Sequence, residues 1–299
     1  MQVKGGKKMK LLLTGATGKL GTKIAECLLT KVPAESLAVS VRDPKKAEWL
    51  RAKGVDVRHG DFDHPETLDT AFAGVDRLLI ISADGDNETR IRQHTAAVAA
   101  AQRAKVGFIA YTSVVNARES ILPLALPHRA TEEAIQKTGI PYAILRNNWY
   151  LENEIGNILA VKAGRPWVTA TGKGRVGWAL RQDYAEAAAT VLAEEGHENT
   201  IYELSGNLMT VDELASAVGD LIGIDVEVQH LDEDEYAAMM KNTGVPESAL
   251  PFLLELQRGI REGALDVESN DFEKLLGRPV TPTKEALRQI LNDLEKTGN

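Results

Sequence analysis

The sequence predicts an α/β protein built on a Rossmann-like, doubly wound parallel sheet, with a small, mostly helical C-terminal lobe. Apolar runs of strand length alternate with helical patterns over the first half of the chain, which is typical of parallel strands covered by helices on both faces. The first run leads into three glycines at spacing three and then into a helical pattern. The composition, 43% hydrophobic and 26% charged over 299 residues, is sufficient for a full α/β core.

In the first half of the chain, predicted strands alternate with predicted helices. The first helix is marked by apolar residues at positions 20, 24, 27 and 28, which share one helical face. Right-handed crossovers between parallel strands then leave little freedom in topology. A loop carrying Pro123 and Pro127 is expected before the last of these helices. Strands are expected at 11–13, 37–41, 55–58, 77–81, 107–112 and 142–146, and the later helices at 44–53, 65–72, 88–104 and 129–137.

The regular alternation of predicted strands and helices ends beyond Tyr150. A glycine-rich stretch is followed by a helix at 183–194 and a strand at 201–204, which are expected to return to the main sheet. Thr210 and Glu213 have the capping-box spacing and open a predicted helix. Further helices are expected at 232–242, at 247–259 and from 284. The predicted organisation is a Rossmann-like domain at 1–150 and a lobe at 151–299 that is interleaved with returning sheet elements.

Charge and cysteine content narrow the classes of partner. The net charge of -8 argues against nucleic acid as the main partner, because phosphate binding needs a basic face. The sequence contains no apolar run of membrane length and no signal-peptide core, and residues 1–8 are too short and polar to target the chain. A single cysteine, Cys27, allows no intrachain disulfide and fits a small core residue in a reducing cytosol. We expect a cytoplasmic protein with a small-molecule partner and no membrane partner, and a homodimer is left open.

The segment after the first strand has the composition of an anion-binding turn. In such a strand-turn-helix, the first glycine allows a tight turn, the second lets backbone N–H groups approach a pyrophosphate, and the third permits close packing of the helix. The helix N-terminus adds the positive end of its dipole. A glycine triplet alone is common loop chemistry, but this context favours a dinucleotide site. The residues expected to hold the dinucleotide here are Gly15, Ala16, Thr17, Gly18, Lys19, Leu20 and Gly21.

The end of the second strand indicates which dinucleotide is preferred. An acidic residue there usually binds the ribose 2′-hydroxyl of NAD, whereas an arginine accommodates the 2′-phosphate of NADP. This strand ends in Arg42, whose guanidinium can offer two parallel N–H groups to a phosphate, and Asp43 follows. We therefore expect NADPH to be preferred and NADH to bind more weakly. Asp43 and the neighbouring Lys45 and Lys46 leave mixed specificity open.

Two further turns are expected to border the cofactor. Asp61 is placed to accept a hydrogen bond from the adenine amino group, with Phe62 packing nearby. Ser82 and Ala83 end the fourth strand and are small, which suits a close approach of the pyrophosphate and ribose. The same region, 59–64, holds two histidines and two carboxylates, but the spacings of a structural zinc site are absent and we expect no metal.

The residues of common dehydrogenase and hydrolase chemistry are missing. None of the six tyrosines is followed by a lysine four residues later, so the sequence lacks the pair in which a lysine lowers the pKa of a tyrosine acid. The sequence contains no G-x-S-x-G nucleophile elbow and no H-E-x-x-H motif. A sugar-nucleotide epimerase, which needs the tyrosine–lysine pair, is therefore disfavoured.

Several stretches together resemble one family over nearly the whole chain. The glycine motif is shared by many families, whereas the Arg-Asn-x-x-Tyr stretch is much more specific. The chain resembles the NmrA-like atypical short-chain dehydrogenases, and within them the branch of type 2 NAD(P)H:quinone oxidoreductases and triphenylmethane reductases. The stretches that carry this resemblance are Gly15–Gly21, Ser40–Arg42, Ile109–Ser113, Leu145–Asn153, Glu194–Glu198 and Leu276–Gly277.

The resemblance implies where the cofactor and acceptor bind. NADPH would lie at residues 15–21 and Arg42, and Asn147 would lie beside the nicotinamide. Asn148, Trp149 and Tyr150 would form the substrate pocket. Independently of the resemblance, we expect the C-terminal lobe to close over the reactive end of the cofactor. Isoflavone reductases and redox sensors of this family carry a lysine where this chain has His128, so their proton-donor chemistry is not expected here.

A mechanism without a tyrosine–lysine pair follows from the chemistry of the acceptor. Quinones and cationic dyes already accept hydride well, so the protein mainly needs to hold the acceptor against the nicotinamide and exclude water. Candidate proton donors are Tyr150 and His128, since a histidine can titrate near neutral pH. His128 is equally well interpreted as a helix-start residue in a polar loop, and Trp149 either as a stacking wall or as core packing. The competing hypothesis is a non-catalytic NADP(H) sensor or regulator with the same cofactor site.

Overall fold

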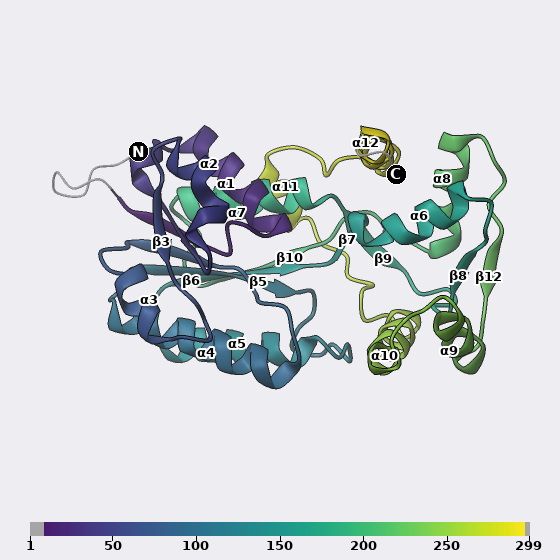
Figure 1. Cartoon of the computed structure of the whole chain (residues 1–299), viewed down its shortest axis with the longest axis horizontal. Helices are drawn as coiled ribbons and strands as arrows, with labels where there is room; N and C mark the ends of the chain where they lie inside the picture. Colours follow the sequence, from purple (N-terminus) through teal and green to yellow (C-terminus); the bar gives the residue numbers. More distant parts are fainter. Residues whose placement is uncertain (1–8, 297–299) are drawn as a thin grey trace. The chain divides into compact units, whose positions relative to one another are not determined.

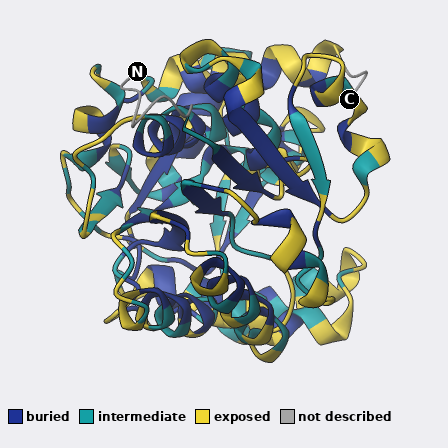
Figure 2. Cartoon of the chain, turned by 90° about the vertical axis from the view of Figure 1, so that its left-hand side faces the viewer, coloured by how far each residue is buried: buried dark blue, intermediate teal, exposed yellow. Residues whose placement is uncertain are grey.

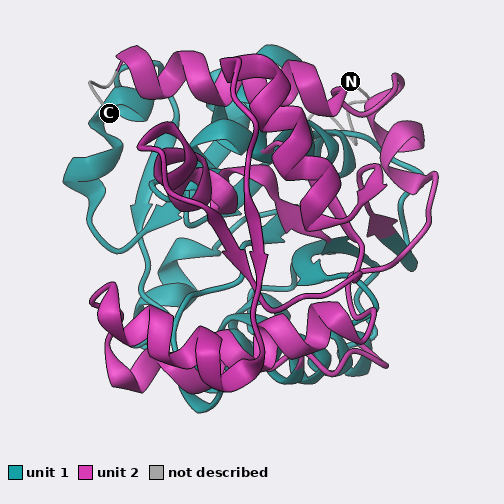
Figure 3. Ribbon diagram, turned by 90° about the vertical axis from the view of Figure 1, so that its right-hand side faces the viewer, with its two compact units in different colours: residues 1–117, 126–147, 181–202 teal, residues 118–125, 148–180, 203–299 magenta. Residues whose placement is uncertain are grey.

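The computed structural model describes residues 9–296, so the N-terminal segment 1–8 considered above and residues 297–299 lie outside it. The chain forms two compact units, each assembled from separate stretches of sequence (Figure 3). Within the described part, no helix is both long enough and apolar enough to pass through a bilayer. Unit 1 comprises residues 1–117, 126–147 and 181–202, and unit 2 comprises residues 118–125, 148–180 and 203–299.

Unit 1 is organised around a sheet that is flanked by helices (Figure 1). Helices α1 and α7 cover one face, and α3, α4 and α5 cover the other. The helices are α1 (Lys19–Lys31), α2 (Glu48–Arg51), α3 (Glu66–Ala71), α4 (Asn87–Arg103), α5 (Ala125–Lys137) and α7 (Arg181–Ala193). The strands are β1 (Leu11–Thr14), β2 (Leu37–Val41), β3 (Asp56–His59), β4 (Arg77–Ile80), β5 (Phe108–Val114), β6 (Tyr142–Asn147) and β10 (Thr200–Leu204), of which the last two residues of β10 are counted in unit 2.

The strand order places a topological switch point beside β1. The seven described strands run in the order β10-β6-β5-β4-β1-β2-β3, and the pairs from β6 to β3 are parallel. The chain therefore moves outward from β1 to β2 and β3, and then crosses to β4 on the other side. Ligands of open α/β sheets bind at this switch point, outside the carboxyl ends of the strands. The predicted Rossmann-like sheet is confirmed, and so is the return of the strand near 201–204 to it.

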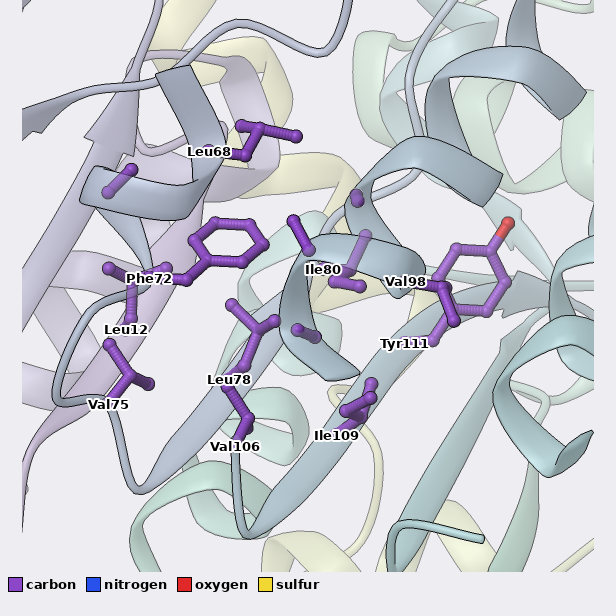
Figure 4. Packing of buried hydrophobic residues seen from close by; sticks show 14 of the residues in the cluster. Leu12, Leu68, Phe72, Val75, Leu78, Ile80, Val98, Val106, Ile109 and Tyr111 are labelled. Atoms are coloured by element: carbon purple, nitrogen blue, oxygen red, sulfur yellow. The ribbon is translucent and has the colours of Figure 1, made fainter. Parts of the chain in front are cut away.

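The strands at the centre of the sheet are buried along their whole length. Every residue of β1, β2, β4 and β5 is buried, whereas β3 at the edge is more exposed (Figure 2). Burial on both faces explains why these strands appear in the sequence as continuous apolar runs rather than as alternating patterns. On the face covered by α3, α4 and α5, the core includes Leu12, Phe72, Ile80, Val98 and Tyr111 (Figure 4).

Several elements of unit 1 differ from the expected ones. The stretch expected as one helix at 44–53 is a 3-10 turn, Pro44–Ala47, followed by the short α2. Helix α5 begins at Ala125, four residues before its expected start, so the expectation that Pro127 lies in a loop is wrong. A proline is tolerated in the first turn because the backbone N–H groups there have no partner within the helix.

Unit 2 contains more short strands than the sequence indicates. One sheet has the order β11-β9-β7, and a second pairs β12 with β8. The strands are β7 (Trp149–Tyr150), β8 (Trp167–Thr169), β9 (Val176–Ala179), β11 (Leu208–Met209) and β12 (Val228–His230). Runs of two to four residues carry little periodicity, and partners such as Trp167 and Val228 are far apart in the chain.

The helices of unit 2 agree better with expectation. The predicted capping box of Thr210 and Glu213 is present at the start of α8. The helix expected at 247–259 is a 3-10 turn followed by α10, and neither α6 nor α11 was indicated by the sequence. These helices are α6 (Ile155–Lys162), α8 (Val211–Ile222), α9 (Glu233–Asn242), α10 (Leu250–Arg261), α11 (Asp271–Leu276) and α12 (Thr283–Lys296), with 3-10 turns at Leu151–Glu154 and Glu247–Ala249.

Candidate dinucleotide site

The turn that follows β1 has the geometry that the glycine motif predicts. Gly15 has a φ of +65°, a left-handed conformation that favours glycine. Its N–H donates to the Ser40 carbonyl at 3.1 Å, and its own carbonyl accepts from the Gly18 N–H at 3.0 Å. A Cβ on Gly21 would lie 2.1 Å from the Gly15 carbonyl oxygen, so helix α1 can approach the turn this closely only with glycine there. The predicted structural roles of the first and third glycines are therefore confirmed.

The N-terminus of α1 is open to an anion. Its N-cap residue is Gly18, which has no side chain to accept a hydrogen bond, and the first turn contains no acidic side chain. The unpaired N–H groups of a first helical turn normally need such a partner. Gly15, Gly18 and the side chains of Thr17 and Lys19 are exposed here. Exposed backbone donors at the positive end of a helix dipole form a cradle that fits a phosphate group.

A hydroxyl group joins β1 to β4 below this cradle. Thr14 Oγ1 accepts from the Ile81 N–H at 3.0 Å and donates to the Leu79 carbonyl at 3.3 Å. The two strands that border the switch point are therefore held together at their carboxyl ends. The next residue, Ser82, donates its N–H to Thr112 Oγ1 at 2.9 Å, which extends the connection to β5.

Arg42 and Asp43 follow β2 and differ in their surroundings. The Asp43 carboxylate accepts the Lys45 N–H at 3.0 Å and so caps the 3-10 turn that begins at Pro44. Arg42 is exposed and forms no hydrogen bond with any residue in the described part of the chain. Its charge helps to lower the pKa of Asp63, after the hydrogen bonds that Arg92 and Gln93 donate to that carboxylate. A guanidinium without a fixed partner is available to a phosphate.

The turn after β3 holds the residues expected near the adenine. Asp61 Oδ1 accepts the Asp63 N–H at 3.0 Å, and the Asp61 N–H donates to Thr67 Oγ1. The Phe62 ring is partly buried against the core cluster. A Cβ on Gly60 would lie 2.1 Å from Ser40 Oγ, so this turn also approaches β2 closely. Among the described residues, no group of three or more histidine, cysteine or acidic side chains is arranged to hold a metal ion.

The expectation that His128 titrates near neutral pH is wrong. The residue lies inside α5 rather than in a polar loop, and its side chain is buried. Its Nε2 lies 3.0 Å from Arg90 Nη2, and its Nδ1 lies 2.8 Å from the Tyr111 hydroxyl oxygen. Burial, then the charge of Arg90 and the neighbouring His94, hold the pKa of His128 well below its usual value. The ring is therefore neutral near pH 7, and both of its nitrogens are engaged.

Asn147, the last residue of β6, and Asn148, which follows it, belong to different units. Asn147, in unit 1, is buried, and its carbonyl accepts the Val115 N–H at 3.0 Å. Asn148, in unit 2, is also buried, and its side-chain nitrogen donates to Ser205 Oγ and to the Leu265 carbonyl, both at 3.0 Å. Its Oδ1 has no partner among the described residues. The amide nitrogen of Asn148 therefore serves the structure of unit 2, which leaves only its oxygen for a ligand.

Trp149 and Tyr150 form β7 and are half-buried. Trp149 lies opposite Trp178 of β9, whose Nε1 donates to Glu154 Oε1 at 3.2 Å. Burial raises the pKa of Glu154, while hydrogen bonds from Asn157 and both tryptophans oppose this rise. Trp149 thus has a structural partner in unit 2 in addition to any role as a stacking surface.

A set of buried polar residues in unit 1 escaped the sequence-based interpretation. Arg90 and His94 lie one helical turn apart on α4, and Tyr111 and Thr131 face them from β5 and α5. The available signal was the periodicity of α4, because positions 90 and 94 fall on the same face as the buried Ala97 and Ala101. Polar side chains on the buried face of an alanine-rich helix indicate an internal hydrogen-bond network.

Comparison with known proteins shows which family shares these features. A family model described as NAD(P)H-binding matches residues 15–195. Quinone oxidoreductase 2 of Escherichia coli (strain K12) is 38% identical over 283 residues, which cover 94% of this chain and 99% of that protein. An NmrA-like family domain-containing oxidoreductase, FlvB of Aspergillus flavus, is 30% identical over 293 residues, which cover 95% of each chain.

Solved structures agree with these relatives. The NADPH complex of the E. coli quinone oxidoreductase QOR2 has a TM-score of 0.90 at 38% identity and covers 94% of this chain and 100% of that one. The NADP(H) complex of Citrobacter sp. triphenylmethane reductase has a TM-score of 0.88 at 42% identity and covers 94% of this chain and 99% of that one. This chain therefore belongs to the NAD(P)H-binding, NmrA-like family of oxidoreductases.

Proposed function

We propose that this chain is an NADPH-dependent reductase that transfers hydride directly to a quinone-like or dye-like acceptor. The observation that carries the proposal is the pairing of an open glycine cradle at 15–21 with the unpartnered, exposed Arg42 after the neighbouring strand. The cradle fits a pyrophosphate, and the guanidinium fits a 2′-phosphate. The similarity to a quinone oxidoreductase and to a triphenylmethane reductase supports the class of acceptor.

The residues around the site would contribute binding and orientation. Gly15 to Gly21 and Arg42 would hold the phosphates, Ser82 and Ala83 would border the ribose, and Asn147 would lie beside the reactive ring. When bound, NADPH supplies the hydride. Holding two reactants in register contributes on the order of 7–11 kcal/mol to a reaction of this kind. Direct transfer to an acceptor that is already electrophilic therefore needs no tyrosine–lysine pair.

A proton is required for some acceptors and not for others. A quinone that accepts hydride becomes an oxyanion and must take a proton, whereas a cationic triphenylmethane dye becomes a neutral product without one. We assign proton delivery to Tyr150, because His128 is neutral and both of its ring nitrogens are engaged. The acceptor pocket is assigned to Asn148, Trp149 and Tyr150.

The test measures oxidation of NADPH with a simple quinone and, separately, with a cationic triphenylmethane dye. Wild-type protein is expected to oxidise NADPH with both acceptors. Tyr150→Phe is expected to lower kcat with the quinone by at least about tenfold and to leave kcat with the dye within about twofold, because a general acid typically contributes 10² or more. Equal effects on both acceptors would instead mean that Tyr150 shapes the pocket.

The same assay separates the enzyme from the sensor. A protein that binds NADPH but oxidises it with neither acceptor would overturn the proposed reaction and favour a non-catalytic sensor. A protein with no affinity for NADPH would overturn both functions. We place the activity in a reducing compartment such as the cytosol, because the single cysteine, Cys27, is a buried free thiol.

A further inference from the structure

His94 is fully buried in unit 1, and both of its ring nitrogens have polar partners. Its Nε2 lies 2.8 Å from the backbone nitrogen of Ala83, in the turn that follows β4. Its Nδ1 lies 2.9 Å from Thr131 Oγ1 on α5. The Thr131 hydroxyl in turn lies 2.6 Å from the Pro127 carbonyl oxygen. One side chain therefore joins α4, α5 and the turn beside the switch point.

The hydrogen-bond partners fix the protonation of His94. A backbone N–H can only donate, so Nε2 must accept from Ala83 and carries no proton. The ring proton is then on Nδ1 and is donated to Thr131 Oγ1. Because Thr131 donates its own proton to the Pro127 carbonyl, its oxygen is free to accept. This single tautomer gives every polar group from the Ala83 N–H to the Pro127 carbonyl a suitable partner. In a charged imidazolium, Nε2 would also carry a proton, and that N–H would face the N–H of Ala83.

A second histidine in contact with the same tyrosine has an equally defined state. Arg90 can only donate, so His128 Nε2 accepts from it, and the His128 proton on Nδ1 is donated to the Tyr111 hydroxyl oxygen. Tyr111 lies between the two rings, with its oxygen 3.4 Å from His94 Nδ1. Figure 4 shows the tyrosine hydroxyl pointing out of the apolar cluster, away from Phe72. His94 is therefore held by polar partners on several sides.

The backbone that His94 holds belongs to the proposed cofactor site. The N–H groups of Ser82 and Ala83 are satisfied by two side chains, Thr112 and His94 respectively. These two N–H groups point into unit 1 and are therefore not donors for a ligand. The turn that carries the small side chains of Ser82 and Ala83 is therefore held in a defined shape.

We propose that His94 is a positioning residue for dinucleotide binding, because its neutral ring fixes the turn at Ser82 and Ala83 that borders the cofactor. The inference rests on the proposed cofactor site and adds to it a residue that touches neither cofactor nor acceptor. An apolar side chain would fill the same space but would leave the Ala83 N–H without a partner. That N–H would then seek another partner, and the turn would lose its fixed shape.

Two substitutions at position 94 test the hydrogen bonds of the two ring nitrogens separately. In His94→Gln, the side-chain oxygen can reach the position of Nε2 and accept from Ala83. In His94→Asn, the shorter amide reaches only the position of Nδ1, so it can still donate to Thr131 but not accept from Ala83. We expect the NADPH dissociation constant, measured by calorimetry, to rise about tenfold in His94→Asn and to stay within about threefold of wild type in His94→Gln.

Position 131 provides an independent pair of variants that does not depend on the folding of His94→Asn. Thr131→Val removes the acceptor of the Nδ1 proton and so favours the other tautomer, which cannot accept from Ala83. Thr131→Ser keeps the hydroxyl and is the matched control. Weaker NADPH binding is expected for Thr131→Val and near-wild-type binding for Thr131→Ser.

A second measurement distinguishes positioning from loss of stability. Hydrogen exchange of the peptide covering 81–86, in protein without cofactor, is expected to be faster in His94→Asn than in His94→Gln, while exchange in β1 stays the same. With quinone as acceptor, His94→Asn is expected to raise KM for NADPH and to leave kcat nearly unchanged.

The outcomes separate this inference from the proposed function. If wild-type protein binds NADPH and both variants at position 94 bind it equally well, the positioning role is wrong. The same holds if exchange at 81–86 is identical in the two variants. If wild-type protein fails to bind NADPH, the proposed function is wrong, and the exchange data then show on their own whether His94 fixes the turn.

Discussion

Arg42 and Asp43 are neighbours in the sequence but differ in the contacts that they form. Asp43 caps the turn that begins at Pro44, so its carboxylate is already engaged. An acidic residue in that role is a poor partner for a ribose 2′-hydroxyl, so we propose that the exposed Arg42 discriminates between the two dinucleotides. The sequence alone left mixed specificity open at this point, because a cap and a ribose ligand look identical in a list of residues.

Arg42→Ala is therefore expected to raise KM for NADPH by about 10-fold to 100-fold, the range expected when charge-assisted hydrogen bonds to a phosphate are lost. KM for NADH should change by less than about twofold, because NADH has no 2′-phosphate. Steady-state kinetics with both cofactors and one quinone measures the effect, and Lys45→Ala is the control for a general loss of positive charge. Equal changes for the two cofactors would remove the 2′-phosphate assignment.

The protonation state of His128 is a property of one residue that could not be predicted from the sequence. Its position in the chain is compatible with a proton donor, and its type is compatible with titration near pH 7. What decides its state is the arrangement of Arg90, His94 and Tyr111 around it, and these residues come from α4 and β5. A pKa is set by burial and by charges that are distant in sequence, so it could not be predicted from the residues on either side.

At the scale of elements, the glycines of two helices allow a matched test. Gly21 lies in α1, where a Cβ would meet the Gly15 carbonyl oxygen at 2.1 Å, whereas Gly156 lies in α6 with nothing within 4 Å. Gly21→Ala is expected to destabilise the protein by more than about 3 kcal/mol and to abolish NADPH binding, because the clash is with backbone. Gly156→Ala should stabilise it by about 0.5–1 kcal/mol. Urea unfolding and calorimetric titration measure both effects, and similar stability changes would contradict the close helix–turn packing.

The start of β4 and the end of α7 depend on one buried arginine. Arg77 donates from Nε to the Leu192 carbonyl at 2.9 Å, and from Nη2 to the carbonyls of Val191 and Glu194, both at 2.8 Å. Its guanidinium also lies 3.8 Å from the centre of the Phe108 ring. The last carbonyls of a helix have no partner within the helix, so this side chain caps α7 from the sheet.

Arg77→Met keeps the length and apolar character of the side chain but leaves those carbonyls without a donor. We expect a loss of about 2–3 kcal/mol in the free energy of unfolding, measured with urea. Arg77→Lys should retain part of the stability because an ammonium group cannot reach all three carbonyls. The surface control is Arg51→Met, which removes an exposed ion pair with Glu48 and should cost less than about 1 kcal/mol. Comparable losses at the two positions would contradict the capping role.

The elements that could be predicted are those specified by local residues. The capping box at Thr210 and the glycine turn at Gly15 are each written in a few consecutive positions, and both are present as predicted. The pairing of Trp167 with Val228 is not, because it joins short segments that are separated in the chain by two helices and three strands. The polar network around His94 was missed for the same reason, since its members lie on α4, β5 and α5 and only their arrangement in space gives them a common role.

At the scale of the whole molecule, acid stability follows from the two buried histidines. Burial and the charge of Arg90 lower the pKa of His94 from 6.5 to about 4, and that of His128 is lowered well below 6.5. Between the two pKa values the unfolded chain binds a proton that the folded protein excludes. The contribution of each histidine to stability is therefore complete above about pH 6.5 and declines as the pH falls toward the folded pKa.

Protonation of His94 in the unfolded chain should cost about 2 kcal/mol of stability at pH 5 relative to pH 7.5, because a difference of one pH unit below the unfolded pKa is worth about 1.4 kcal/mol. The lowered pKa of His128 acts in the same direction. Urea unfolding at the two pH values measures the loss. His94→Gln removes one titrating group while keeping a partner for Ala83, so the loss between pH 7.5 and pH 5 should be about 2 kcal/mol smaller in this variant. The lowered pKa values of Asp56 and Asp63 act mainly below this window, since carboxylates remain charged in both states at pH 5. An unchanged difference in His94→Gln would mean that His94 is protonated in the folded protein, which contradicts the tautomer that its partners require.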